Sequence, residues 1–171
     1  MRNAILLIAF LFRSANALAQ DPLDTALRDA QRLAECMKAL DAPCVIALSD
    51  VKSYQLLSAT GFDFTKAQTR YFDSLREHGW GWISFDVTAP RQVFQDGIRL
   101  YAFVPYVSRS NFGGQIHTKQ TFEVALSADR GETWMFVDGT HLTPARMRVI
   151  IPSYSGQALP PTRELEPTGG Q

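Results

Sequence analysis

The sequence predicts an α+β fold in which helices from the first half of the chain pack on one curved, antiparallel, meandering sheet. Apolar residues recur at three- and four-residue spacing before Gly79, which is helical periodicity, whereas they alternate with polar residues from Trp82 onward, which is strand periodicity. The predicted strands are joined by connections of hairpin length, which is typical of antiparallel neighbours. One face of the sheet should therefore be covered by the helices.

Residues 1–19 have the layout of a secretory signal peptide. Arg2 provides a positive start, residues 4–12 form an unbroken apolar run, and residues 17–19 supply small side chains at a cleavage point. The apolar run is far shorter than the roughly 20 residues that a membrane helix needs. A buried N-terminal helix is the alternative. The layout predicts a periplasmic or secreted protein without a membrane span.

The rest of the chain is predicted to be a single domain over residues 20–151, followed by a mobile tail over residues 152–171 with several prolines and glycines. Hydrophobic residues make up 46% of the chain and charged residues 20%, as in ordinary globular proteins. Without residues 1–19, the basic residues number two fewer than the 17 acidic ones, and no segment gathers positive charge. The sequence thus argues against nucleic acid and against an anionic membrane surface as partners.

The first predicted helix begins at Asp21-Pro22, because aspartate is a favourable N-cap and proline fits the first helical position. Its apolar stripe runs to Leu40, and charged residues fill its other face. Residues 44–58 show a mixed pattern with an interruption in the middle. They predict one broken helix or two short ones.

Cys36 and Cys44 predict a disulfide, which is the default for two cysteines in an oxidising compartment. Along one continuous helix they would lie about 12 Å apart, whereas bonded Cα atoms lie within about 7 Å of each other. The bond therefore requires the chain to reverse, and residues 41–43, Asp-Ala-Pro, lie where the reversal is expected. Two reduced core cysteines are the alternative. A metal site is less favoured because no histidine is near.

A further helix is predicted to be capped by Asp63 or Thr65 and to stop at Gly79. Alternation then predicts four strands, and Pro105 in the second of them indicates an edge or an end of pairing. Residues 108–114 are the expected loop after that strand. The strands are expected at residues 82–88, 98–107, 116–127 and 133–138, with residues 143–151 forming a short helix or a final extended piece.

The pattern Ser127-x-Asp129-x-Gly131-x-x-Trp134 predicts a rigid hairpin turn between the last two strands. The aspartate carboxylate accepts backbone N–H groups of such a turn, glycine takes its positive φ, and tryptophan packs over it. The pattern resembles the Asp-box repeated in sialidase-type propellers. A single copy in so short a chain carries no sialidase chemistry.

A helix-then-sheet chain that closes on Trp134-x-Phe-x-Asp138-Gly139 resembles the nuclear-transport-factor-2-like superfamily. The similarity covers roughly residues 23–151. It extends to secreted bacterial members with a cysteine-containing first helical hairpin and a Leu-Tyr-Ala-Phe-Val-Pro strand, here residues 100–105. The resemblance implies a cone, in which one curved antiparallel sheet wraps around helices.

The resemblance also implies a pocket enzyme as one function, since ketosteroid isomerase-like and dehydratase-like members transfer protons inside the cone. Such enzymes use a carboxylate whose pKa is raised by apolar walls. Strand alternation places Asp86 and His117 among solvent-facing residues, and Asp138 next to a glycine is more typical of a turn. The candidate catalytic residues are Asp86, Tyr54, Tyr101, His117 and Asp138.

A second hypothesis concerns the outer face of the sheet. A mixture of aromatic and charged side chains is typical of surfaces that meet a protein partner or a second copy of the chain. Alternation places on this face the aromatic residues Trp82, Tyr101 and Phe103, together with Arg99, Lys119 and Glu123.

No metal and no cofactor is predicted, because the three histidines show no ligand spacing and no glycine-rich loop joins a strand to a helix. The sequence favours non-catalytic binding, either of a small apolar ligand in the cone or of a protein partner on the outer sheet face. The alternative is a pocket enzyme of isomerase or dehydratase type. That function requires an enclosed cavity, at least two convergent polar side chains and a carboxylate of raised pKa.

Overall fold

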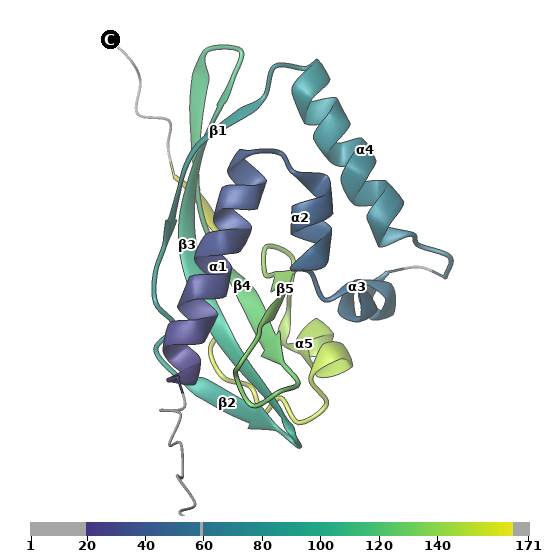
Figure 1. Cartoon of the computed structure of the whole chain (residues 1–171), viewed down its shortest axis with the longest axis vertical. Helices are drawn as coiled ribbons and strands as arrows, with labels where there is room; N and C mark the ends of the chain where they lie inside the picture. Colours follow the sequence, from purple (N-terminus) through teal and green to yellow (C-terminus); the bar gives the residue numbers. More distant parts are fainter. Residues whose placement is uncertain (1–19, 59, 166–171) are drawn as a thin grey trace, which may run out of the picture.

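The computed structural model describes residues 20–58 and 60–165, so the predicted signal peptide lies outside the described residues. In the described part, five helices and an open six-stranded antiparallel sheet form an α+β fold (Figure 1). The helices are α1 (Pro22–Lys38), α2 (Ala42–Ala47), α3 (Val51–Leu57), α4 (Phe64–Glu77) and α5 (Pro144–Ile150). The strands are β1 (Gly81–Val87), β2 (Val93–Asp96), β3 (Arg99–Phe112), β4 (Gln115–Ser127), β5 (Met135–Asp138) and β6 (Arg163–Leu165).

The long strands β3 and β4 form the central hairpin of the sheet. β4 pairs on its other side with β5 and β6, and β3 pairs on its other side first with β2 and then with β1. Pro105 lies between those two stretches, where its carbonyl accepts a hydrogen bond from the Thr88 N–H at 2.8 Å. The proline therefore sits at a break in pairing on one side of β3, as predicted, although the strand itself is central.

Two strand features differ from the prediction. β3 continues through most of the expected loop to Phe112, because buried Ser108 and Ser110 keep pairing with β4 and β1. β2 and β6 were not predicted, since each is only a few residues long and shows little alternation.

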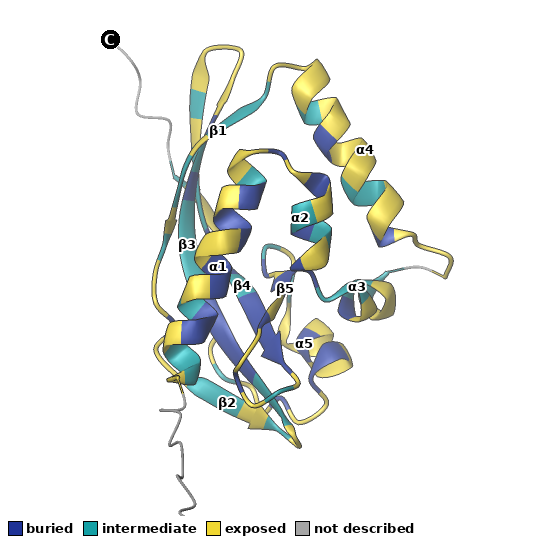
Figure 2. Ribbon diagram, in the orientation of Figure 1, coloured by how far each residue is buried: buried dark blue, intermediate teal, exposed yellow. Residues whose placement is uncertain are grey.

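One face of the sheet is covered by α1, with α2 and α4 beyond it (Figures 1 and 2). The apolar stripe of α1, with Ala26, Ala30 and Leu33, is buried against Ala102 and other small or branched residues of β3 and β4. The charged side of α1 remains exposed, as an amphipathic helix requires. No helix in the described residues is long and apolar enough to cross a membrane.

The opposite face is covered too, by α5 and the chain that follows it. Ile151 and Tyr154 are buried against Tyr101, Phe103 and Phe122, and β6 pairs with β4. Tyr154 and β6 therefore attach this segment to the sheet at two points, where the sequence predicted a mobile tail from residue 152. This segment is rich in prolines and glycines, but the buried side chain of Tyr154 and the pairing of β6 with β4 hold it on the sheet.

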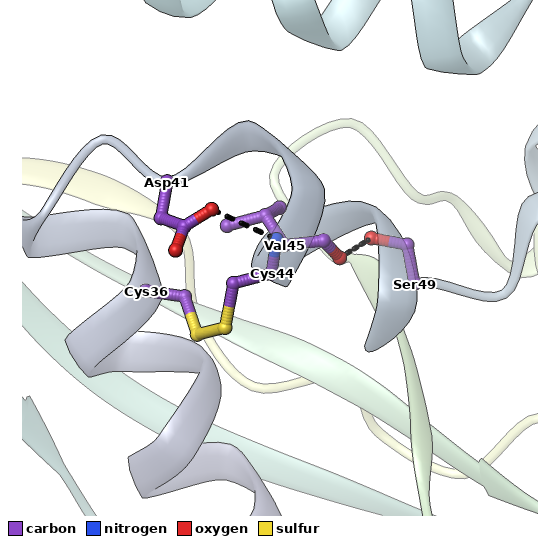
Figure 3. Close-up of a disulfide and its surroundings, with 5 residues drawn as sticks. All are labelled: Cys36, Asp41, Cys44, Val45 and Ser49. Carbon is purple, nitrogen blue, oxygen red and sulfur yellow. Dashed lines mark hydrogen bonds between the residues drawn. A yellow bond between two sulfur atoms is a disulfide. The ribbon is translucent and has the colours of Figure 1, made fainter.

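Cys36 and Cys44 form the predicted disulfide, with their Cα atoms 5.7 Å apart (Figure 3). The chain reverses at Leu40, whose φ of 52° is in the left-handed region. Asp41 then caps α2 by accepting a hydrogen bond from the Cys44 N–H at 3.0 Å. The disulfide fixes α2 against the end of α1.

The turn between β4 and β5 is tied to the start of α1. The Asp129 carboxylate accepts hydrogen bonds from the Thr133 N–H at 3.0 Å and from the Thr133 hydroxyl at 2.6 Å. The indole of Trp134 is buried and donates to the Thr25 hydroxyl at 3.0 Å. Gly131 has a φ of 91° and lies so near Pro22 that an added Cβ would come within 2.7 Å of the proline Cβ.

We expect Asp129→Asn to reduce the free energy of unfolding by about 1–2 kcal/mol at pH 7. The hydrogen bond from the Thr133 hydroxyl is the largest of the causes that lower the pKa of Asp129, to about 2. Because the folded-state pKa is lowered, this stabilisation is present above pH ~4 and is lost as the pH falls toward 2. Urea unfolding of both proteins between pH 2 and 7 measures the effect. A difference in unfolding free energy between the two proteins that stays constant over that pH range would contradict the account. The control is Glu132→Gln, at an exposed position of the same turn.

Candidate functional site

A pocket of about 260 Å³ lies between the helix-covered face of the sheet and the helices. Four helices and four strands contribute side chains to it, and α4 closes the side away from the sheet. Its lining residues are Leu33, Met37, Val45, Ser49, Tyr54, Phe64, Gln68, Tyr71, Trp82, Tyr106, Ser108, Lys119, Glu123, Phe136, Asp138 and Thr140.

Glu123 provides the carboxylate at the sheet side of this pocket. Alternate residues of β4 face opposite sides, and Glu123 shares its side with Ala125 of the helix-covered core. Its cross-strand neighbours are Val104 on β3 and Asp138 on β5. Like charges directly opposite each other destabilise a sheet, so the register itself places an unfavourable carboxylate pair at the pocket.

Burial raises the pKa of Glu123 well above its usual value, and the negative charge of Asp138 raises it further. Lys119, which lies on the same side of β4, acts in the opposite direction. The accessible part of the Glu123 side chain belongs to the pocket wall. The carboxyl group is therefore poorly hydrated and favours the neutral form.

Several polar groups of the pocket have no partner. Among the described residues, no group donates a hydrogen bond to the Glu123 carboxylate, and none bonds to the Tyr106 hydroxyl. The indole Nε1 of Trp82 is also buried without an acceptor. Buried polar groups are normally hydrogen-bonded. Trp82 is such an exception in the pocket wall, and the unpartnered Glu123 and Tyr106 side chains line the same cavity; this convergence of polar groups is typical of a ligand site.

Asp138 is held in a network at the edge of the pocket. Its carboxylate accepts hydrogen bonds from the Thr140 N–H at 2.8 Å and from the Thr140 hydroxyl at 2.7 Å. Lys119 donates to the same Thr140 hydroxyl at 3.1 Å. The Tyr54 hydroxyl accepts from the Asp138 backbone N–H at 2.8 Å, which leaves the phenolic proton free to be donated. This network engages Asp138 and Lys119 but does not reach Glu123.

Three tyrosines from three elements face the pocket. Burial is the largest cause that raises the pKa of Tyr54, Tyr71 and Tyr106, and the carboxylates nearby add to it. Their hydroxyls therefore stay protonated and are available as hydrogen-bond donors to a ligand. Tyr54 is further fixed by stacking on Phe64, with ring centroids 4.1 Å apart.

The predicted catalytic candidates are divided between the pocket and other parts of the molecule. Tyr54 and Asp138 line the pocket, and Asp138 is also exposed at its edge, whereas exposed Asp86 on β1 does not line it. His117 is also exposed and stacks on Trp80, outside the pocket. Tyr101 is buried on the opposite face of the sheet. Asp86, His117 and Tyr101 do not line the pocket and are therefore not candidates for chemistry in it.

The predicted partner surface needs a correction as well. Tyr101 and Phe103 are 1% and 8% exposed, because α5 and the following chain cover them. Trp82 packs with the helix-covered core and lines the pocket on the other side of the sheet. The three aromatic residues thus do not form one exposed face.

Sequence reasoning missed Glu123 and Lys119 as pocket residues. They alternate with apolar Phe122 and Val124, so their side of β4 resembled a solvent-facing side. The signal that identifies them is the register with β3, which sets Glu123 opposite Val104 on the helix-covered face.

Other parts of the described chain offer weaker sites. A larger hollow of about 540 Å³ lies on the opposite face of the sheet, between β-strand residues and the C-terminal segment, and its one charged lining residue is exposed Arg91. No group of three or more metal-ligating side chains comes together in residues 20–58 and 60–165. The 260 Å³ pocket is preferred over that hollow because it combines a carboxyl group of raised pKa and other unpartnered polar groups with aromatic walls.

Comparison of the chain with protein-family models, with curated proteins and with solved structures found no match. The function is therefore argued from the geometry of the pocket.

Proposed function

We propose that this protein binds a small molecule in the pocket around Glu123. The observation that carries the proposal is the Glu123 carboxyl group, which faces a cavity of about 260 Å³ without a hydrogen-bond partner among the described residues. Leaving such a group unpaired is costly. A ligand with an apolar body and one polar group would compensate that cost while covering the aromatic wall.

The same arrangement supports a pocket enzyme as a second candidate function. A buried carboxyl of raised pKa beside tyrosine hydroxyls is what proton transfer at neutral pH requires. In that function Glu123 would exchange a proton with the substrate, and Tyr54 or Tyr106 would donate a hydrogen bond to the oxygen where negative charge develops. Substitution by glutamine separates the two functions, because it would abolish turnover but would only weaken binding.

Two further proposals concern family and location. Helices α1–α4, with a pocket between them and an antiparallel sheet, support membership of the nuclear-transport-factor-2-like superfamily and a cone-like sheet. The Cys36–Cys44 disulfide supports a periplasmic or secreted protein with a cleaved signal peptide. A protein partner or second copy at the outer sheet face is less well supported, since Tyr101 and Phe103 are buried.

The proposal is tested by filling the pocket from α4. A library of small fragments is screened by ligand-observed NMR against the wild type, Gln68→Trp and Arg70→Trp. Gln68 lines the pocket, whereas exposed Arg70 on the same helix does not. Fragments that bind the wild type should lose at least about tenfold in affinity for Gln68→Trp and keep their affinity for Arg70→Trp. Equal losses in both variants, or none in either, would place binding elsewhere and overturn the proposal.

A further inference from the structure

We propose that the ligand of this pocket is a small organic cation, an amine or quaternary ammonium compound whose charged nitrogen lies among the aromatic rings and beside Glu123. The inference rests on the proposed function, since it names the chemical class of the molecule that the pocket would bind. Three observations support it: the aromatic wall, the balance of charge and the size of the cavity.

The wall of the pocket is unusually aromatic. Rings from α3, α4, β1, β3 and β5 line it, so that they come from several sides rather than from one surface. The faces of such rings carry partial negative charge and attract cations, with tryptophan the strongest and tyrosine next. The aromatic lining residues are Tyr54, Phe64, Tyr71, Trp82, Tyr106 and Phe136.

The charges of the pocket leave one negative group without compensation. Glu123 and Asp138 face each other across β4 and β5, whereas Lys119 is the one basic side chain among the lining residues. Lys119 is engaged with Thr140, and Thr140 also holds Asp138. The remaining titratable groups of the wall are the three tyrosines, which stay protonated, and no histidine lines the pocket.

A cation is the ligand that relieves this imbalance. Without a ligand, the buried Glu123 avoids an uncompensated charge by holding a proton. A positively charged nitrogen at the same place would stabilise the carboxylate, so that binding replaces the proton by the cation. A neutral ligand would leave Glu123 protonated, and an anion would oppose the ionisation of Glu123, as Asp138 already does.

The size of the cavity fits a compact ligand. At about 260 Å³ it is smaller than the roughly 300 Å³ at which pockets for drug-sized molecules begin. A single ammonium group with a short apolar substituent would fit within it. This restricts the proposal to small amines and quaternary ammonium ions.

The test compares cations with neutral molecules of the same shape. Calorimetry of the wild type is carried out with choline against its neutral carbon isostere dimethylbutanol, with benzylamine against benzyl alcohol, and with further pairs of this kind. At least one cation should bind about tenfold or more tightly than its neutral isostere. Its affinity should rise with pH through the titration of Glu123, because binding releases the proton.

Glu123→Gln provides the matched variant, since it keeps the shape of the side chain and removes its charge. It should lose the pH dependence and the preference for the cation, so that the cation binds this variant no more tightly than its neutral isostere does. Neutral isosteres that bind the wild type as well as the cations do would overturn the cation proposal and leave the pocket function standing. A panel in which neither cations nor isosteres bind would instead count against the pocket function itself.

Discussion

Glu123→Gln should raise the melting temperature at pH 8, because it removes the carboxyl group that is most costly to ionise in the folded protein. Burial and Asp138 raise the folded-state pKa of Glu123. For such a group the stabilising contribution is complete below the unfolded pKa near 4.5 and is lost as the pH rises through the folded pKa. Between the two pKa values, the wild type loses up to about 1.4 kcal/mol per pH unit relative to the variant.

Thermal unfolding of the wild type and Glu123→Gln between pH 4 and 9 checks this expectation. The two proteins should differ little at pH 4, and the variant should become progressively more stable above it. Glu132→Gln, at an exposed position of the β4–β5 turn, is the control and should follow the wild type at every pH. If Glu123→Gln were less stable than the wild type at pH 8, the carboxylate would have a favourable partner and the account would be wrong.

Gly139→Ala should be strongly destabilising, by about 1–3 kcal/mol, although alanine is a small residue. Gly139 follows Asp138 at the end of β5, and its N–H donates to the Phe122 carbonyl at 2.8 Å. An added Cβ would lie 2.5 Å from that carbonyl oxygen and equally near the Phe122 ring. Backbone atoms of a central strand cannot move away cheaply, so β5 would have to shift and take Asp138 with it.

Gly81→Ala is the matched control for this experiment. Gly81 begins β1, has no atom within 4 Å of the position of an added Cβ, and does not have a left-handed φ. Alanine there should leave stability unchanged or raise it by about 0.4–1 kcal/mol. Urea unfolding of both variants measures the difference, and equal stability of the two would show that the β5 end is not packed as described.

Local chemistry made much of the fold predictable from the sequence. Asp21-Pro22 gives an unambiguous start for α1, and the Cα spacing of a disulfide requires the reversal between Cys36 and Cys44 that the structure contains. Gly79 likewise ends α4 with a φ of 66°. Each of these features depends on residues close together in the chain, so no knowledge of the tertiary structure is needed.

The pocket could not be predicted in the same way, because it depends on how β3 and β4 pair. In each strand the apolar residues were expected to face the helices. The register instead sets Val104 opposite Glu123, so the apolar side of β3 shares a face with the polar side of β4. Both faces of the sheet are covered, and alternation cannot distinguish a polar residue facing a pocket from one facing solvent.

The packing of the C-terminal segment was the other feature beyond sequence reasoning. Its prolines and glycines are typical of mobile tails, yet Tyr154 is buried and Arg163 begins a short strand on β4. That segment covers Tyr101 and Phe103, which explains why the predicted partner surface is not exposed. A single buried tyrosine and a strand of three residues produce no periodic pattern that could be recognised in a sequence.

The most direct test of the account is an NMR titration of the Glu123 side-chain carboxyl carbon. Glutamate labelled with ¹³C at the carboxyl group would be assigned through the signal that disappears in Glu123→Gln. The account predicts a midpoint well above the usual 4.5 in the free protein, and a lower midpoint in the presence of a bound cation. A midpoint near 4.5 in the free protein would mean that the carboxyl group is hydrated or paired, and it would contradict the central claim.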